Sequence, residues 1–171
     1  MRTSLAIFRD KRLFSIFVFG IASGFPWVMI SSVLSAWLKD ESLSRSAIGL
    51  FGAIFAVYSF NFLWAPLLDR IKPLALGQRR GWIGQMQLLI IGCCVWMSTL
   101  DAQSSLYQIA LCGFIIALSS ATQDIAIDAF RIDTIAQHET DAMSAASSLA
   151  TAGWWTGYGG LGAIPFLVAD L

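Results

Sequence analysis

The segment from Leu106 to Phe130 is apolar enough to cross a membrane, yet it carries two carboxylates, Asp124 and Asp128, near its end. Ionisable side chains are costly in the hydrocarbon core and persist there mainly where they line a polar path or pair with a neighbour. Because Asp124 and Asp128 are four residues apart, they share one helix face. Arg131, three residues beyond Asp128, continues this face. The pattern predicts a transporter helix rather than a lipid-facing anchor.

The same face continues backward through small residues, namely Ser120, Ala117 and Gly113. Small side chains allow two membrane helices to approach closely. We therefore expect a second helix to pack against this ladder.

The composition requires lipid as the solvent of the folded chain. Hydrophobic residues make up 57% of the chain and charged residues only 13%, whereas soluble domains carry about 25% charged residues. The mean hydropathy is +0.69. The net charge of zero excludes the basic field typical of nucleic-acid-binding proteins. The three cysteines have neither a CxxC spacing nor a partner histidine, so no metal site or disulfide is expected.

Five segments are long and apolar enough to cross a bilayer core about 30 Å thick. The sequence thus predicts an all-α polytopic transmembrane bundle in which residues 1–171 form a partial N-terminal domain. The predicted spans are roughly 13–38, 47–68, 82–100, 105–127 and 143–169. An odd number of spans favours a piece of a longer protein over a complete five-span protein.

Lys and Arg are distributed unevenly over the short loops. Nine of the 11 basic residues fall on the side that holds the N-terminus, including Arg2, Arg9 and Lys72, and two, Lys39 and Arg45, fall on the other. Because cytoplasmic loops are enriched in Lys and Arg, this bias predicts a cytoplasmic N-terminus.

The first predicted span contains Gly24 and Pro26 near its middle. Proline lacks an amide donor and weakens the helix. Two interpretations fit this break: a backbone opening that binds substrate, as in transporters, or a kink that serves packing.

The loop after the second span holds Asp69 and Arg70, and Arg79 and Arg80 stand where the third span begins. Such charges can form ion pairs that hold one arrangement of helices and release in another. The alternative is positive-inside anchoring alone.

Five short motifs follow one another along most of the chain. They are Gly20–Pro26 (GIASGFP), Ile48–Phe51 (IGLF), Phe62–Arg70 (FLWAPLLDR), Leu76–Trp82 (LGQRRGW) and Ser120–Ala129 (SATQDIAIDA). Together these motifs resemble the major facilitator superfamily, and within it the muropeptide permeases of the AmpG type, with acetyl-coenzyme A transporters as more distant relatives.

The resemblance implies a proton-coupled importer in a bacterial inner membrane, with the proton gradient in place of a cofactor. The implied substrates are anhydromuropeptides, which are N-acetylglucosamine linked to anhydro-N-acetylmuramic acid with or without peptide, recovered for cell-wall recycling. The implied partners are the bilayer, this substrate and the missing C-terminal helices. By motif position, the transport-sensitive residues would be Gly24, Ala121, Gln123 and Asp124, and the cytoplasmic gate would comprise Asp69, Arg70 and Arg80. The further charges Arg79 and Arg131 are predicted to belong to the same gate.

One departure from the resemblance lies in the fifth span. Where the family usually shows Gly-Tyr-Arg, this chain has Gly153, Trp154 and Trp155. Indole rings can pack on the apolar faces of sugars, so the change can alter substrate preference. The other interpretation is that Trp154 and Trp155 only fill space in the helical bundle.

Asp124 is the better candidate for proton coupling, with Asp128 as the second. From Ser105 to Asp124 the helix rises about 28 Å, which places Asp124 near the cytoplasmic boundary. Two roles are therefore open for Asp124: proton coupling, or an ion pair with Arg70 or Arg131. Gln85, early in the third span, is expected to bond a neighbouring helix or to reach the cavity.

Three other functions stay open. The chain can belong to a transporter of another solute, such as a sugar or an acyl-CoA, or it can be a truncated membrane fragment without transport. An enzyme is disfavoured, because no histidine lies in a span and the only one, His138, lies in a polar loop.

Overall fold

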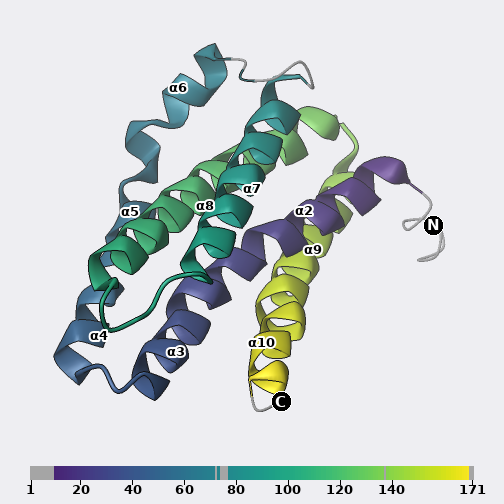
Figure 1. Cartoon of the computed structure of the whole chain (residues 1–171). Helices are drawn as coiled ribbons and strands as arrows, with labels where there is room; N and C mark the ends of the chain where they lie inside the picture. Colours follow the sequence, from purple (N-terminus) through teal and green to yellow (C-terminus); the bar gives the residue numbers. More distant parts are fainter. Residues whose placement is uncertain (1–9, 72, 74–76, 137, 170–171) are drawn as a thin grey trace. The chain divides into compact units, whose positions relative to one another are not determined.

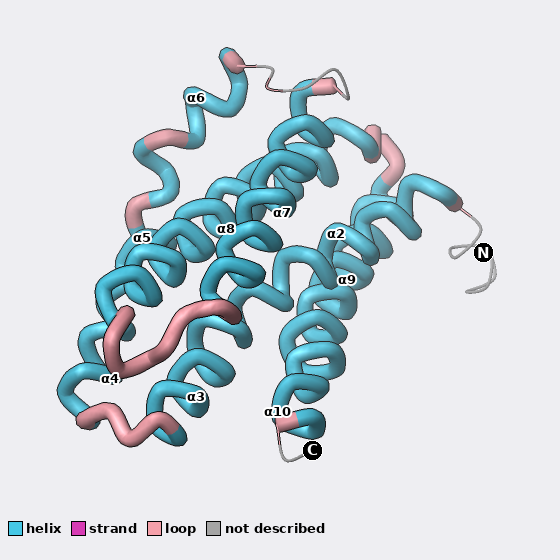
Figure 2. Tube along the Cα trace, viewed as in Figure 1, coloured by secondary structure: helices cyan, strands magenta, loops and turns pink. Residues whose placement is uncertain are grey.

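The computed structural model describes residues 10–71, 73, 77–136 and 138–169. Every regular element in this part of the chain is a helix (Figures 1 and 2), which confirms the predicted all-α fold class. Arg2, Arg9, Lys72 and Leu76, on which parts of the orientation and motif arguments rest, lie outside the described residues.

The helices follow one another with short connections, and several are interrupted by π or 3-10 turns (η). The elements in chain order are α2 (Lys11–Val28), η1 (Met29–Val33), α3 (Leu34–Asp40), α4 (Arg45–Phe51), η2 (Gly52–Phe55), α5 (Ala56–Ser59), η3 (Asn61–Leu63), α6 (Ala65–Arg70), α7 (Gln78–Met97), α8 (Leu106–Thr134), α9 (Thr140–Trp155), η4 (Thr156–Gly160), η5 (Leu161–Ala163) and α10 (Ile164–Val168).

Among the described residues, three helical segments have the length and composition to cross a membrane: Lys11–Asp40, Arg45–Leu63 and Leu106–Thr134. They overlap the first, second and fourth predicted spans. Helices α7 and α9 overlap the third and fifth, and the membrane boundaries of all five spans stay predictions. Helix α8 continues to Thr134, beyond the expected end of the fourth span at 127.

The chain divides into two compact units. The first unit comprises Met1–Phe25 and Ile127–Leu171, and the second comprises Pro26–Ala126. Helices α2 and α8 each contribute residues to both units.

The first helical segment changes its winding just after Pro26. Residues Met29–Val33 form a π turn, after which α3 resumes an ordinary helix. Proline supplies no amide and crowds the preceding turn, and wide turns of this kind occur mainly as single interruptions of α-helices. The expected break at Pro26 is thus a widened turn and not an end of the helix.

The second helical segment is less regular. Ser44 caps α4 through its side chain, which accepts a hydrogen bond of 3.2 Å from the Ala47 amide. Further on, Trp64 precedes the Ala65–Pro66 start of α6, where proline has no donor to continue the preceding turn. The segment therefore consists of short α and 3-10 pieces rather than one rod.

Helix α7 begins at Gly77, whose φ of 91° is favourable only for glycine. Three bonds join this start to the end of α6. Gln78 Nε2 donates to Leu68 O at 2.9 Å, Trp82 Nε1 donates to Ile71 O at 3.0 Å, and Arg79 pairs with Asp69. These contacts fix the α6–α7 connection within the second unit.

Apolar side chains from several helices form the core of the second unit. One cluster contains Ile30, Ile90, Cys93, Cys112, Ile116 and Ala117, and another contains Leu34, Leu38, Phe51, Ala102 and Ile109. The predicted close approach at the small-residue ladder of α8 is confirmed. A Cβ on Gly113 would lie 3.2 Å from Ile54 Cδ1.

In the first unit, α2 and α9 run side by side (Figure 1) and approach through glycines. Gly20 faces the backbone of Ala150 and Gly153, and Gly24 faces the carbonyl of Trp154. Backbone-to-backbone contact of this kind leaves no room for a side chain.

Candidate functional site

The buried face of α8 carries most of the residues predicted to be sensitive for transport. Ser120, Ala121 and Gln123 are each 0% exposed. Asp124 follows them and is half-buried. A polar face this deeply covered on an apolar helix is unusual unless it serves a polar path or a polar partner.

Asp128 lies one turn beyond Asp124 in a different environment. Its side chain is 68% exposed, and its carboxylate oxygen accepts a hydrogen bond of 3.1 Å from Arg131. Arg131 also donates to the Ser147 hydroxyl of α9 at 2.8 Å. The structure thus separates the two predicted carboxylates into a half-buried one and a surface ion pair.

Tyr58 brings a phenol to the polar face of α8 in the second unit. Its hydroxyl lies near that of Ser120 and interacts electrostatically with the Asp124 carboxylate. The Tyr58 and Ser120 hydroxyl oxygens are both buried, and neither makes a hydrogen bond of good geometry with the described residues. Buried polar atoms are nearly always paired, and these two hydroxyls lie close enough to interact with each other.

Trp64 binds the same helix. Its indole Nε1 donates a hydrogen bond of 3.1 Å to Thr122 Oγ1, and the Thr122 hydroxyl donates to Leu118 O at 2.7 Å. Trp64 and Thr122 both lie in the sequence motifs described above, but no role was predicted for either residue. Their separation of 58 positions left no local signal for this bond.

Gln85 Oε1 is buried, and no described residue donates to it. The predicted bond of the Gln85 amide to a neighbouring helix stays a prediction. Whether Gln85 reaches a substrate cavity stays a prediction.

The predicted gate residues fall into two groups. Asp69 and Arg79 form an ion pair of 2.6 Å in the second unit, where Arg70 and Arg80 are exposed neighbours at the same helix ends. Arg131 belongs to the first unit, where its established contacts go to Asp128 and Ser147. The gating role of these charges stays a prediction.

Trp154 and Trp155 form an aromatic group with Tyr158 in the first unit. Trp154 stacks on Tyr158 with ring centroids 5.0 Å apart, and Trp155 meets Trp154 edge-on at 5.1 Å. Trp155 is 60% exposed. Trp154 therefore fits the packing interpretation, whereas Trp155 offers an open ring.

A bidentate ion pair closes the α8–α9 connection and was missed in the sequence. Both guanidinium nitrogens of Arg12 donate to Glu139, each at 3.0 Å, and Asp10 binds the same guanidinium. The Arg12 hydrogen bonds hold the pKa of Glu139 below its ordinary range, assisted by the Ala136 amide. Arg12 was assigned only to the positive-inside count, because 127 positions separate it from its partner.

Glu139→Gln is expected to lower the thermal stability of the purified chain slightly at neutral pH. A depressed carboxyl pKa contributes stability above the ordinary glutamate range, and the contribution is lost as the pH falls through the lowered value. Melting curves of wild type and variant should therefore differ at pH 7 and converge in acid. A difference that persists at low pH would contradict this assignment. The pair is solvent-exposed, so high salt should also reduce the effect.

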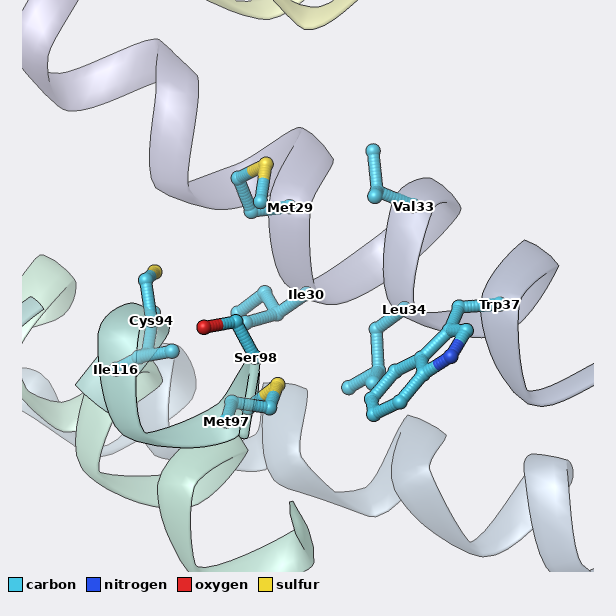
Figure 3. Close-up of a pocket in the computed structure, with 9 residues that line it drawn as sticks. All are labelled: Met29, Ile30, Val33, Leu34, Trp37, Cys94, Met97, Ser98 and Ile116. Atoms are coloured by element: carbon cyan, nitrogen blue, oxygen red, sulfur yellow. The ribbon is translucent and has the colours of Figure 1, made fainter. Parts of the chain in front are cut away.

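One apolar pocket of about 300 Å³ lies in the second unit. Figure 3 shows residues of η1 and α3 facing residues of α7 across it. The lining is formed by Met29, Ile30, Val33, Leu34, Trp37, Cys94, Met97, Ser98 and Ile116. No predicted site residue lines this pocket, and Ser98 is its one hydroxyl side chain. Such a lining does not suit a charged glycopeptide.

The sequence pattern of the acetyl-coenzyme A transporter 1 family matches residues 13–168. The chain belongs to this transporter family. The match covers nearly every helix described above, and it places the chain among membrane transporters.

Several bacterial proteins are similar to this chain over most of its length. The anhydromuropeptide permease of Escherichia coli K12 is 37% identical over 145 residues, which cover 85% of this chain and 30% of the permease. A putative transporter AmpG 4 of Rickettsia felis is 36% identical over 146 residues, covering 84% and 35%. An uncharacterized protein of Haemophilus influenzae is 39% identical over 136 residues, covering 80% and 32%. The chain thus spans about a third of the length of these relatives, and the resemblance to AmpG-type permeases is confirmed.

Proposed function

We propose that this chain is the N-terminal part of a proton-coupled importer of anhydromuropeptides in a bacterial inner membrane, with its N-terminus in the cytoplasm. The observation that carries the proposal is the half-buried Asp124 on the covered polar face of α8, in a chain 37% identical to a protein named anhydromuropeptide permease. Its membrane and small-molecule partners follow from the transporter family.

Asp124 is the proposed proton carrier. Its side chain is half-buried on an apolar helix, one turn after the fully buried Ser120. Tyr58 and Ser120 provide hydroxyls beside it. The proton gradient would then supply the energy, and a cofactor is not required.

The Asp69–Arg79 pair is the proposed cytoplasmic latch. A surface ion pair contributes little to stability by itself, so its opening is not costly. The same holds for Asp128 with Arg131. Alternating access would break and remake such pairs while substrate is bound.

Uptake of radiolabelled anhydromuropeptide by cells that lack their own permease tests the proposal. Residues 1–171 expressed together with the sequence that continues their reading frame (the joined sequence) should give uptake that a protonophore abolishes. Residues 1–171 alone should give none. Uptake that resists the protonophore would contradict proton coupling. Uptake by residues 1–171 alone would contradict the assignment as a part of the carrier.

The family description favours a second candidate, which is transport of an acyl-CoA. Competition separates the two substrates. An excess of unlabelled acetyl-CoA should leave muropeptide uptake unchanged, and strong inhibition would favour the second candidate. If neither solute is taken up by the joined sequence, a membrane fragment without transport becomes the better description.

Trp155→Arg is expected to shift preference toward anionic, peptide-bearing muropeptides by about tenfold, because a charge-assisted bond to a carboxylate is worth about 1.5–3 kcal/mol. Because Trp155 is exposed, a charged arginine side chain can be accommodated at this position. Competition between peptide-bearing and peptide-free substrates measures the shift. Trp154→Arg serves as the comparison. Because Trp154 is half-buried and stacked on Tyr158, replacing it should instead lower the amount of protein in the membrane. An unchanged competition ratio for Trp155→Arg would support a packing role.

A further inference from the structure

An aromatic cluster in the second unit lies beside the polar face of α8, and its ring faces have no role in the function proposed so far. It consists of Trp27 of α2, Phe55 of η2 and Tyr58 of α5. The ring centroids of Trp27 lie 4.7 Å from Tyr58 and 5.1 Å from Phe55, and those of Phe55 and Tyr58 are 6.1 Å apart. Each residue is only half-buried.

The atoms of Tyr58 are not equally buried. Its hydroxyl oxygen is buried near Ser120 and Asp124, although the residue as a whole keeps exposed surface. The exposed surface of the residue therefore excludes the hydroxyl oxygen. The hydroxyl end lies near α8, and the rings of Trp27 and Phe55 contact the Tyr58 ring.

This combination suits one class of ligand. Aromatic rings held in fixed orientation bury the apolar C–H face of a pyranose. Carboxylates and hydroxyls nearby accept and donate hydrogen bonds with sugar hydroxyls, and bonds to a charged carboxylate are the stronger ones. Peptide recognition would instead need cations for carboxylates, and none belongs to this cluster of Trp27, Phe55 and Tyr58.

We propose that Trp27, Phe55 and Tyr58 form the platform that binds the sugar rings of the substrate. The proposal rests on the proposed import of muropeptides and names the part of that substrate which this unit recognises. The exposed ring of Trp155 would then serve another part of the substrate.

Tyr58→Leu and Trp27→Leu in the joined sequence test this platform, because leucine keeps apolar volume and removes the flat ring. Each should raise the KM for the peptide-free disaccharide about tenfold, the loss expected when apolar ring surface is no longer covered. The KM for the peptide-bearing form should rise by the same factor, since both share the sugar. The kcat per membrane-inserted transporter should stay near wild type.

Two further variants separate recognition from folding. Tyr58→Phe keeps the ring and removes only the buried hydroxyl, so its KM should rise only about two- to threefold. Phe60→Ala is the matched control, because Phe60 is 54% exposed two residues further along the chain and lies outside the cluster. Its KM should be unchanged. Equilibrium dialysis of the labelled disaccharide against detergent-solubilised protein supplies binding constants that do not depend on transport rate.

The outcomes separate this inference from the proposed function. If the wild type takes up muropeptides while Tyr58→Leu and Trp27→Leu leave both KM and binding unchanged, that result overturns the platform and leaves the proposed function intact. A rise in KM confined to the peptide-bearing substrate also overturns it, because the cluster would then read the peptide. If the wild type neither binds nor takes up the disaccharide, the platform falls together with the proposed function.

Discussion

Gly157→Ala is expected to destabilise the first unit by about 2–3 kcal/mol, which is typical of forcing a methyl group into a closed contact. A Cβ on Gly157 would collide with the Ile21 carbonyl oxygen and lie 3.0 Å from its carbonyl carbon. These are backbone atoms of α2, so no side-chain rotation relieves the overlap. Because the same contact repeats at Gly20, Gly24 and Gly153, one added methyl group should disturb the whole α2–α9 interface.

Gly159→Ala is the matched control, since Gly159 lies in the same turn η4 and a Cβ there meets nothing within 4 Å. Thermal unfolding in detergent and the amount of protein in the membrane measure both variants. Gly157→Ala should melt several degrees lower, and Gly159→Ala should melt like wild type. Equal melting of the two variants would show that α2 and α9 do not pack through these glycines.

Asp124→Asn is expected to reduce proton-coupled uptake by the joined sequence at least 100-fold, with a near-normal amount of protein in the membrane. Asparagine keeps the size of the side chain but cannot bind and release a proton. Uptake driven by an imposed pH step in inverted or right-side-out vesicles measures the coupling. Substrate exchange without a gradient should survive, because exchange does not need net proton movement.

Asp128→Asn provides the comparison one turn away. Asp128 is largely exposed and paired with Arg131, so its loss removes a surface ion pair and should change uptake less than threefold. If Asp124→Asn retains gradient-driven uptake, Asp124 is not the proton carrier. Equal losses in both variants would instead favour a charge requirement at the end of α8.

The sequence predicted the helical class and the environment of α8 because both depend on local patterns. Apolar length determines the spans, and small residues at helical spacing determine the close approach seen at Gly113. The predicted shared face of Asp124 and Asp128 holds along the helix, but their unequal exposure depends on which neighbours cover each turn. Local spacing carries no information about those neighbours.

The contacts that escaped prediction join residues far apart in the chain. Trp64 with Thr122 and Arg12 with Glu139 are separated by 58 and 127 positions. Trp27 reaches Phe55 and Tyr58 only because two helical segments fold together. The spacing of Phe55 and Tyr58, three residues apart, was the one local sign of that cluster. Gly157 follows Trp155 by two positions, yet nothing local indicated that Ile21 lies against it.

The widened turn at Met29–Val33 gives the first helix tolerance to a change in length. A π turn holds one more residue than the ordinary turn it replaces. A homologous chain with one residue fewer in this stretch could close it into a regular α-helix while Gly24 and Leu34 keep their faces. Single-residue gaps between aligned sequences should therefore accumulate just after the proline and leave both flanking packing surfaces intact.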